Sequence, residues 1–254
     1  MITIKSKKEI DKMRSAGEII ALVLSRIEES VAPGITTLEL DKIAEEIILK
    51  EAALPSFKGY RISSLVPPYP ASICTSVNSE VVHGIPGETV LKNGDIISID
   101  VGVCKDGMHA DAARTYGVGE ITEESLRLIK VAESSFFNGI RHASEGNRLG
   151  DVSYEIQRTV EENGFSVVRD MVGHGIGREL HEEPQIPNFG HRGKGVRLLA
   201  GMTLAIEPMI NCGDYRVKTG DNRWTIVSVD GSSSAHYENT IVVTSEEPLI
   251  LTII

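Results

Sequence analysis

The spacing of apolar residues predicts two amphipathic helices at the start of the chain. Over residues 7–31, apolar side chains recur every three or four positions, and Pro33-Gly34 ends the segment. A second helix should follow at once, because Thr36 and Glu39 have the spacing of a capping box. Its expected buried stripe consists of Leu40, Ile43 and Ile47.

The spacing then changes to that of extended strands, after which the same order of elements begins again. Alternating residues predict strands at 73–77 and 94–103. Helical spacing returns around Leu126, Ile129, Phe136 and Ile140, and once more after Gly146 in a segment that stops at Asn163-Gly164. Further strands are expected within residues 165–172, 201–209, 223–229 and 239–244.

Two of these strands match each other closely enough to indicate an internal duplication. The segments GDIISID (94–100) and GMTLAIE (201–207) each run from a glycine through alternating apolar residues to a carboxylate. Leu91 and Leu198 each lie three residues before the glycine. We therefore expect an α+β fold with two pseudo-twofold related halves, in which helices cover the outer face of an antiparallel sheet. Because no linker-like segment divides the halves, residues 1–254 are expected to form one domain.

Four carboxylates occupy positions where a charge is costly. Asp100 lies within an apolar strand, and Asp111 follows eleven residues later, a distance that suits a returning hairpin. Glu207 ends the matching strand of the second half, and Glu238 begins the strand after it. A strand-end carboxylate often pairs with a lysine or caps a turn, but that explanation does not account for two matched pairs. Duplication should bring all four to the centre of the molecule.

Three of the seven histidines have settings that favour a role in a site. His174 lies between Gly173 and Gly175, whose backbone can turn sharply and approach the carboxylates. His83 closes a strand before a Gly-Pro turn, and His181 begins a HEEPQ segment that fails the HExxH zinc pattern at its last position. For His83 and His181 an ordinary surface or capping role stays open. No comparable setting exists for His109, His142, His191 and His236.

This set of donors is typical of a divalent metal site. Oxygen-rich ligation with one imidazole suits Mn, Fe(II), Co(II) or Zn. Two shared carboxylates would bridge two ions roughly 3.5 to 4 Å apart, although a single ion satisfies the same pattern.

Composition limits the other classes of function. The net charge of −10 provides no overall basic surface for nucleic acid. Three widely spaced cysteines without a CxxC pair fit a reducing cytoplasm. The N-terminus has no apolar core of a signal peptide, and the apolar run 19–24 is far too short to span a bilayer.

With these residues identified, the chain resembles a type I methionine aminopeptidase of the bacterial kind, in peptidase family M24 with the pita-bread fold. The matching segments are SVNSEVVHGIPG, GDIISIDVGV, DGMHADAARTY, VGHGIGRELHEEPQIPN, GMTLAIEPM, and the WT and AHYENT segments near the end. They cover nearly the whole chain in the order and spacing of the family. The chain starts directly at the first helix without the extensions of other types, which implies a prokaryotic or organellar enzyme.

The resemblance implies a role for each candidate residue. The implied metal ligands for two divalent ions (Co, Mn, Fe, Zn or Ni) are Asp100, Asp111, His174, Glu207 and Glu238, with Asp111 and Glu238 bridging. The implied catalytic residues are Glu207 as proton acceptor and His83 and His181 as imidazoles outside the ligand set. Residues implied to line the methionine pocket are Tyr60, Tyr69, Cys74, Leu180 and Trp224. The implied substrate is the N-terminal methionine of nascent polypeptides, cleaved in the cytoplasm by a monomer near the ribosomal exit tunnel. Neither a membrane nor sequence-specific nucleic acid is expected as a partner.

The chain departs from the family pattern at four places. The loop Tyr60–Pro70 is about six residues longer than the usual GYHGFPAS and lacks its histidine. HGD is replaced by HAD at 109–111, EHT by ENT at 238–240, and NEE by NSE at 78–80. None of the four departures replaces an implied ligand. The longer loop, however, is expected to change the shape of the pocket.

Two alternatives differ in class. An X-Pro aminopeptidase or prolidase usually has an additional N-terminal domain, for which this chain has no room. A non-catalytic binding protein on the same fold should have lost ligands, and all five are present.

Overall fold

The two predicted pairs of helices form and pack against a set of antiparallel strands. The computed structural model describes residues 2–253, and its helices are α1 (Lys7–Ser30), α2 (Thr37–Lys50), α3 (Glu123–Ile140) and α4 (Leu149–Glu162). The predicted capping box at Thr36 and Glu39 is present, and Ser6 and Glu9 form another at the start of α1. Within residues 2–253 we find no helix that is both long and apolar enough to cross a membrane.

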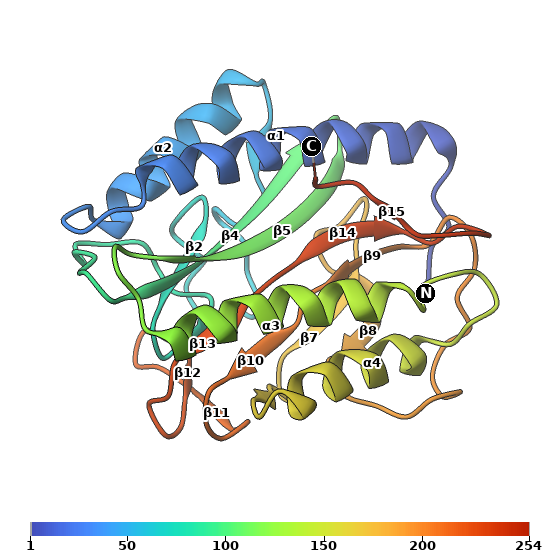
Figure 1. Ribbon diagram of the computed structural model, residues 1–254. Helices are drawn as coiled ribbons and strands as arrows, with labels where there is room; N and C mark the ends of the chain where they lie inside the picture. Colours follow the sequence, from blue (N-terminus) through green and yellow to red (C-terminus); the bar gives the residue numbers. More distant parts are fainter. Residues whose placement is uncertain (1, 254) are drawn as a thin grey trace.

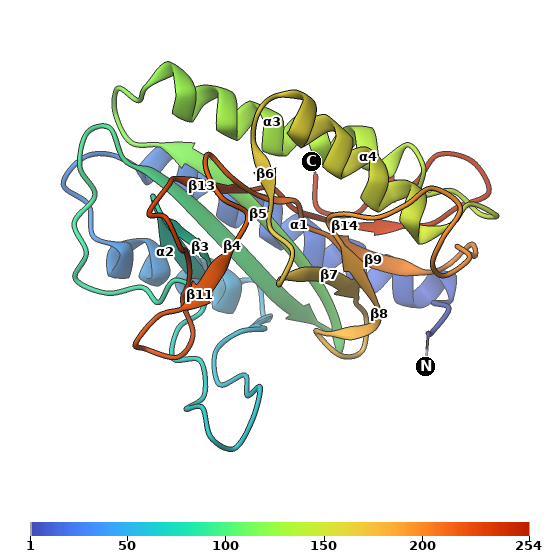
Figure 2. The same cartoon turned by 90° about the horizontal axis from the view of Figure 1, so that it is seen from below.

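The strands pair only in antiparallel fashion within the described residues. The helices lie on the outer side of these strands, α1 and α2 beside the first half and α3 and α4 beside the second (Figures 1 and 2). This arrangement confirms the expected α+β class. The strands are β1 (Leu54–Pro55), β2 (Cys74–Val77), β3 (Glu80–Val82), β4 (Ile96–Lys105), β5 (Met108–Gly117), β6 (Ser166–Val167), β7 (Val172–Gly175), β8 (Glu182–Pro187), β9 (Thr203–Ile206), β10 (Met209–Asn211), β11 (Val217–Thr219), β12 (Ile226–Ser228), β13 (Ser234–His236), β14 (Asn239–Val242) and β15 (Leu249–Ile250).

Two sheets carry the centre of the molecule. In the first, β4 pairs with β1, β2 and β5, and in the second the order is β15-β14-β9-β7-β8. The hairpin predicted between Asp100 and Asp111 is β4–β5, in which Asp111 lies opposite Gly102. Backbone bonds between Glu238 and Ala113, at 3.0 and 3.3 Å, join the second half to β5. The two halves therefore meet where the carboxylates are.

The internal duplication extends to single backbone hydrogen bonds. In the first half, Gly34 N–H donates to Leu91 O at 2.8 Å, and in the second half Gly146 N–H donates to Leu198 O at 3.0 Å. In each half, this bond links the turn between the two helices to a leucine. That leucine lies three residues before the glycine that precedes β4 or β9. The duplication predicted from the matched strands is thus repeated in the connections around them.

The hydrophobic core has two main parts, one under each pair of helices. The predicted buried stripe of α2 was partly wrong, since Ala44 and Ile48 are fully buried whereas Ile43 and Ile47 are only half-buried. Likewise, in α3 Leu126 faces solvent and its near neighbour Leu128 is buried. Helical spacing identifies a helix well, but the angle at which it sits on the sheet depends on packing against other segments.

Two predicted strands are interrupted in the structure. Of residues 165–172, only Ser166, Val167 and the first residue of β7 are extended. The segment 201–209 divides into β9 and β10 on either side of Glu207 and Pro208. Proline lacks an N–H for the sheet, and the break leaves Glu207 free to point toward the other carboxylates.

Candidate metal centre and substrate pocket

The four carboxylates converge from four positions on the two sheets. Asp100 on β4 is opposite Ala113, while Asp111 on β5 is two positions further along, so the two side chains share one face. The register of β9 with β14 pairs Ile206 with Asn239, which places Glu207 and Glu238, the adjoining residues, beside each other.

His174 joins this group from β7. Its Nε2 lies 3.5 Å from Oε1 of Glu207, and its Nδ1 lies 2.9 Å from the carbonyl oxygen of Gly175, so Nε2 faces the carboxylates. The neighbouring glycines are needed for close packing. A β-carbon would lie 2.5 Å from a backbone oxygen at Gly173 and 2.2 Å from another at Gly175. The Gly-His-Gly sequence thus lets β7 pass tightly between β8 and β9.

The site concentrates negative charge in a buried place. Burial raises the pKa of Asp100 to about 7. Burial, followed by the charge of neighbouring carboxylates, raises the pKa values of Asp111, Glu207 and Glu238 as well. Oδ1 of Asp100, Oδ1 of Asp111 and Oε1 of Glu238 have no hydrogen-bond partner among residues 2–253. Buried acceptors without donors are unfavourable unless a cation binds them.

The donor geometry fits a divalent metal. Donor atoms of Asp111, His174 and Glu238 lie within 4.8 Å of one another, and the same holds for Asp100, His236 and Glu238. Glu238 belongs to both groups and lies between them. Carboxylate oxygens with imidazole nitrogens suit divalent ions of the first transition row.

His236 is the residue that the sequence interpretation missed. Its Nε2 lies 3.6 Å from Oε2 of Glu238 and 4.0 Å from Oε2 of Glu207. The ring is 1% exposed and burial lowers its pKa to about 3, so the imidazole is neutral. The signal was available, because His236 and Glu238 are two apart in an extended segment and so point to the same side. The expectation that His236 has no special setting was wrong.

His83 and His181 both line the pocket that contains the carboxylates. His83 follows β3 with a φ of 59° and stands edge-to-face with Trp224, the ring centroids being 6.4 Å apart. Burial, and then the proximity of His181, lower the pKa of His83 to about 4. His181 is exposed at the mouth of the pocket, where its Nδ1 lies 2.6 Å from the hydroxyl of Tyr60. Its ring centroid is 4.3 Å from that of His174.

The pocket has a volume of about 520 Å³. The five candidate ligands, both imidazoles and all five residues implied for methionine binding line it. Tyr69 and Trp224 pack edge-to-face with centroids 5.2 Å apart, and the Tyr69 hydroxyl donates to Gly84 O at 2.7 Å. The wall around these two rings is therefore apolar and well packed, and the candidate ligands and imidazoles supply polar groups to the same pocket.

The long loop between Tyr60 and Pro70 borders this pocket. Its base is closed by a bond from Tyr69 N–H to Tyr60 O at 2.9 Å, and Trp224 Nε1 donates to Pro67 O at 2.9 Å. Ile62 contributes to the lining, whereas Leu65 at the tip is 82% exposed. The loop projects from the body of the chain at the bottom of Figure 2.

Comparison with known proteins identifies the family of the chain and agrees with the fold. The model of metallopeptidase family M24 matches residues 11–245, and the chain belongs to this family. A curated relative, the methionine aminopeptidase of Clostridium perfringens, is 58% identical over the full length of both chains. The crystal structure of methionine aminopeptidase from Thermotoga maritima superposes with a TM-score of 0.96 at 48% identity, with both chains fully covered.

The fold is also shared with an X-Pro aminopeptidase. The Thermotoga maritima enzyme of that name superposes with a TM-score of 0.76 at 21% identity, over 99% of this chain and 62% of that one. This likeness concerns the fold alone. Full-length identity accordingly favours the methionine aminopeptidases over the X-Pro alternative.

Proposed function

We propose that this protein removes the N-terminal methionine from peptides and nascent proteins by hydrolysis at a divalent metal centre. The observation that carries the proposal is a single pocket of about 520 Å³ in which an apolar wall ends at four carboxylates and His174. Identity of 58% to a methionine aminopeptidase over the whole chain supports the choice of substrate.

We propose two divalent ions (Co, Mn, Fe, Zn or Ni), held by Asp100, Asp111, His174, Glu207 and Glu238. The family resemblance supports Asp111 and Glu238 as the ligands that both ions would share, and Glu238 takes part in both groups of donors. When bound, such ions lower the pKa of a water toward neutrality and polarise the carbonyl of the scissile bond.

The chain's own residues would handle the protons. Glu207, whose Oε1 lies 3.5 Å from Nε2 of His174, would take up the proton of the attacking water. If the Tyr60 hydroxyl donates to Nδ1 of His181, the proton of that imidazole is on Nε2, where it can be donated to the developing oxyanion. His83, which is neutral and lines the same pocket, would assist at the amide nitrogen.

The shape of the wall suits an unbranched apolar side chain. Tyr69, Cys74, Leu180 and Trp224 are all buried and line the pocket. Methionine is flexible, and its sulfur packs well against aromatic rings such as those of Tyr69 and Trp224.

A peptidase assay on the purified protein tests this function. We expect release of methionine from Met-Ala-Ser after addition of Mn(II), Co(II) or Fe(II), no release after chelation, and no cleavage of the Nα-acetylated peptide. An X-Pro peptide serves as the control for the alternative peptidase. Full activity after metal removal verified by elemental analysis, or a preference for the X-Pro peptide, would contradict the proposal.

We further propose that the chain forms one catalytic domain and works as a monomer in the cytoplasm, close to the ribosomal exit tunnel. Backbone bonds between Glu238 and Ala113, which join the two halves, support the single domain. The family resemblance supports the cellular setting, because nascent chains present their N-terminus there.

A further inference from the structure

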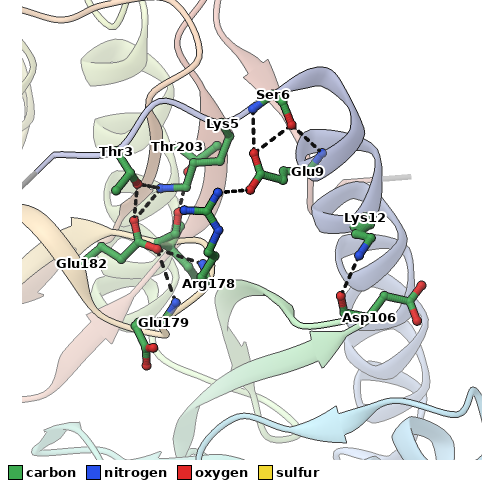
Figure 3. A network of polar contacts seen from close by, with 11 residues as sticks. Thr3, Lys5, Ser6, Glu9, Lys12, Asp106, Arg178, Glu179, Glu182 and Thr203 are labelled. Atoms are coloured by element: carbon green, nitrogen blue, oxygen red, sulfur yellow. Dashed lines mark hydrogen bonds and ion pairs between the residues drawn. The ribbon is translucent and has the colours of Figure 1, made fainter.

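A buried ion pair connects the start of the chain to the turn that carries His181. We call residues 2–6 the N-terminal arm and residues 176–182 the His181 turn. Lys5 of the arm and Glu182 of the turn have side chains only 3% and 10% exposed, with Nζ and Oε2 2.5 Å apart. Figure 3 shows the two side chains pointing toward each other between the arm and the turn.

Glu182 uses its remaining acceptors on the backbone of the same turn. Its Oε1 accepts from the N–H groups of Arg178 at 2.8 Å and Glu179 at 3.3 Å, and its Oε2 accepts from the Thr3 hydroxyl at 2.6 Å (Figure 3). A β-carbon on Gly177 would lie 2.2 Å from Cε of Lys5. The glycine therefore leaves the space that the lysine side chain occupies.

The arm itself is fixed where it joins α1. Lys5 N–H donates to Gly201 O at 2.8 Å, beside the start of β9, and Ser6 caps α1 together with Glu9. Glu9 also forms an ion pair with Arg178 (Figure 3). Lys5 thus sets the position of Glu182 relative to β9 and α1, elements that also support the pocket.

The first part of the His181 turn is anchored through its backbone carbonyl groups. In the later part Glu182 binds the backbone, and the side chains of Arg178 and His181 contact Glu9 and Tyr60. His109 N–H donates to Gly177 O at 2.7 Å, and the Thr203 hydroxyl donates to Ile176 O. Between Gly177 and β8, the side chain of Glu182 binds the backbone of the two residues that precede Leu180. Leu180 and His181, both of which line the pocket, follow directly.

We infer that Lys5 is a positioning residue for His181, acting through Glu182 and the turn; this role rests on the function proposed above. Stability alone does not explain the pair, because desolvation of two buried charges offsets much of their attraction. The ion pair instead holds the Glu182 carboxylate, which binds the backbone of the turn, in one fixed geometry. Displacement of a catalytic group by about 1 Å lowers rates on the order of a hundredfold.

The test compares Lys5→Met with Lys8→Met, which removes an exposed lysine from the first turn of α1. We expect Lys5→Met to lower kcat roughly tenfold to a hundredfold with little change in KM, and Lys8→Met to match the unmodified protein. In the His181→Ala background, Lys5→Met should lower kcat less than twofold further, because its effect passes through His181. Equal losses with and without His181 would overturn the inference.

A second readout does not depend on activity. Amide hydrogen exchange of residues 176–183 should accelerate at least tenfold in Lys5→Met, while exchange in β4 and affinity for Mn(II) by calorimetry stay unchanged. Unaltered exchange in the turn would refute the role of Lys5 even if the protein cleaved no methionine peptide. Conversely, faster exchange in a protein without peptidase activity would support the link between arm and turn and refute the proposed function.

If Lys5→Met does not fold, the neutral double variant Lys5→Met/Glu182→Gln replaces it, since this removes both buried charges together. The glutamine oxygen can still accept from Arg178 N–H, so the double variant should show a smaller acceleration of exchange than Lys5→Met with Glu182→Ala. Equal exchange in these two variants would contradict the claim that Glu182 organises the turn.

Discussion

Arg114 offers the sharpest test of how the two halves are held together at the metal centre. Its guanidinium donates to Glu238 O at 2.6 Å, to Ala113 O at 2.8 Å and to Oδ1 of Asn239 at 2.8 Å. Its Cζ lies 4.2 Å from the ring centroid of Tyr237. One side chain thus binds the strand that carries Asp111 and the segment that carries Glu238.

The perturbation is Arg114→Met, which keeps an apolar stem over Tyr237 and removes every donor. Hydrogen bonds from a charged donor contribute about 1.5 to 3 kcal/mol each, but three bonds from one half-buried group are not additive. We therefore expect the free energy of unfolding to fall by about 3 kcal/mol. For a chain of this length that corresponds to a Tm lower by roughly 6 to 12 °C.

Metal affinity should fall together with stability. Outer partners that orient a ligand typically change metal affinity by about tenfold to a hundredfold. Because Arg114 binds the backbone of Glu238 directly, Kd for Mn(II) should rise by a factor in that range. Arg114→Lys should recover only part of the loss, since an ammonium cannot reproduce the planar set of donors.

Denaturant unfolding in the presence of a chelator and calorimetric titration with Mn(II) measure the two effects. Arg127→Met is the matched control, because Arg127 is exposed and makes one hydrogen bond, to Asn163 O at 3.0 Å. Arg127→Met should lower the free energy of unfolding by no more than about 1 kcal/mol and leave metal binding unchanged. If Arg114→Met were as stable as this control and bound Mn(II) normally, the halves would be held together by other contacts and our reasoning would be wrong.

Four other variants address single parts of the site. His174→Ala should lose metal affinity as well as rate, because it removes a candidate ligand, and calorimetry showing unchanged Mn(II) binding would exclude His174 from the ligand set. His83→Ala and His181→Ala should each keep the metal while losing on the order of a hundredfold in kcat. Near-normal turnover in both variants would show that neither imidazole takes part in catalysis. Replacing residues 61–69 by HGF, which gives the GYHGFPAS connection, should change KM or inhibitor affinity more than kcat, because Ile62 lines the pocket whereas the carboxylates come from other segments. A peptide panel with identical KM values would show the loop to be passive.

Local patterns in the sequence predicted much of the architecture. Apolar spacing located the four helices, because burial on one side of a helix repeats every three to four residues whatever it packs against. The matched segments that run to Asp100 and Glu207 indicated both the duplication and a central group of carboxylates. These features depend on neighbours within a few positions, so one sequence is enough to recognise them.

The tertiary structure decided what depends on segments far apart in the chain. Burial of His236 beneath Glu238 and the rotation of α2 toward Ala44 both follow from packing between elements. The pairing of Lys5 with Glu182 joins residues 177 positions apart and has no local pattern. Apolar spacing indicates which residues share one side of a helix or strand. Only the folded chain determines which residues of other segments they contact.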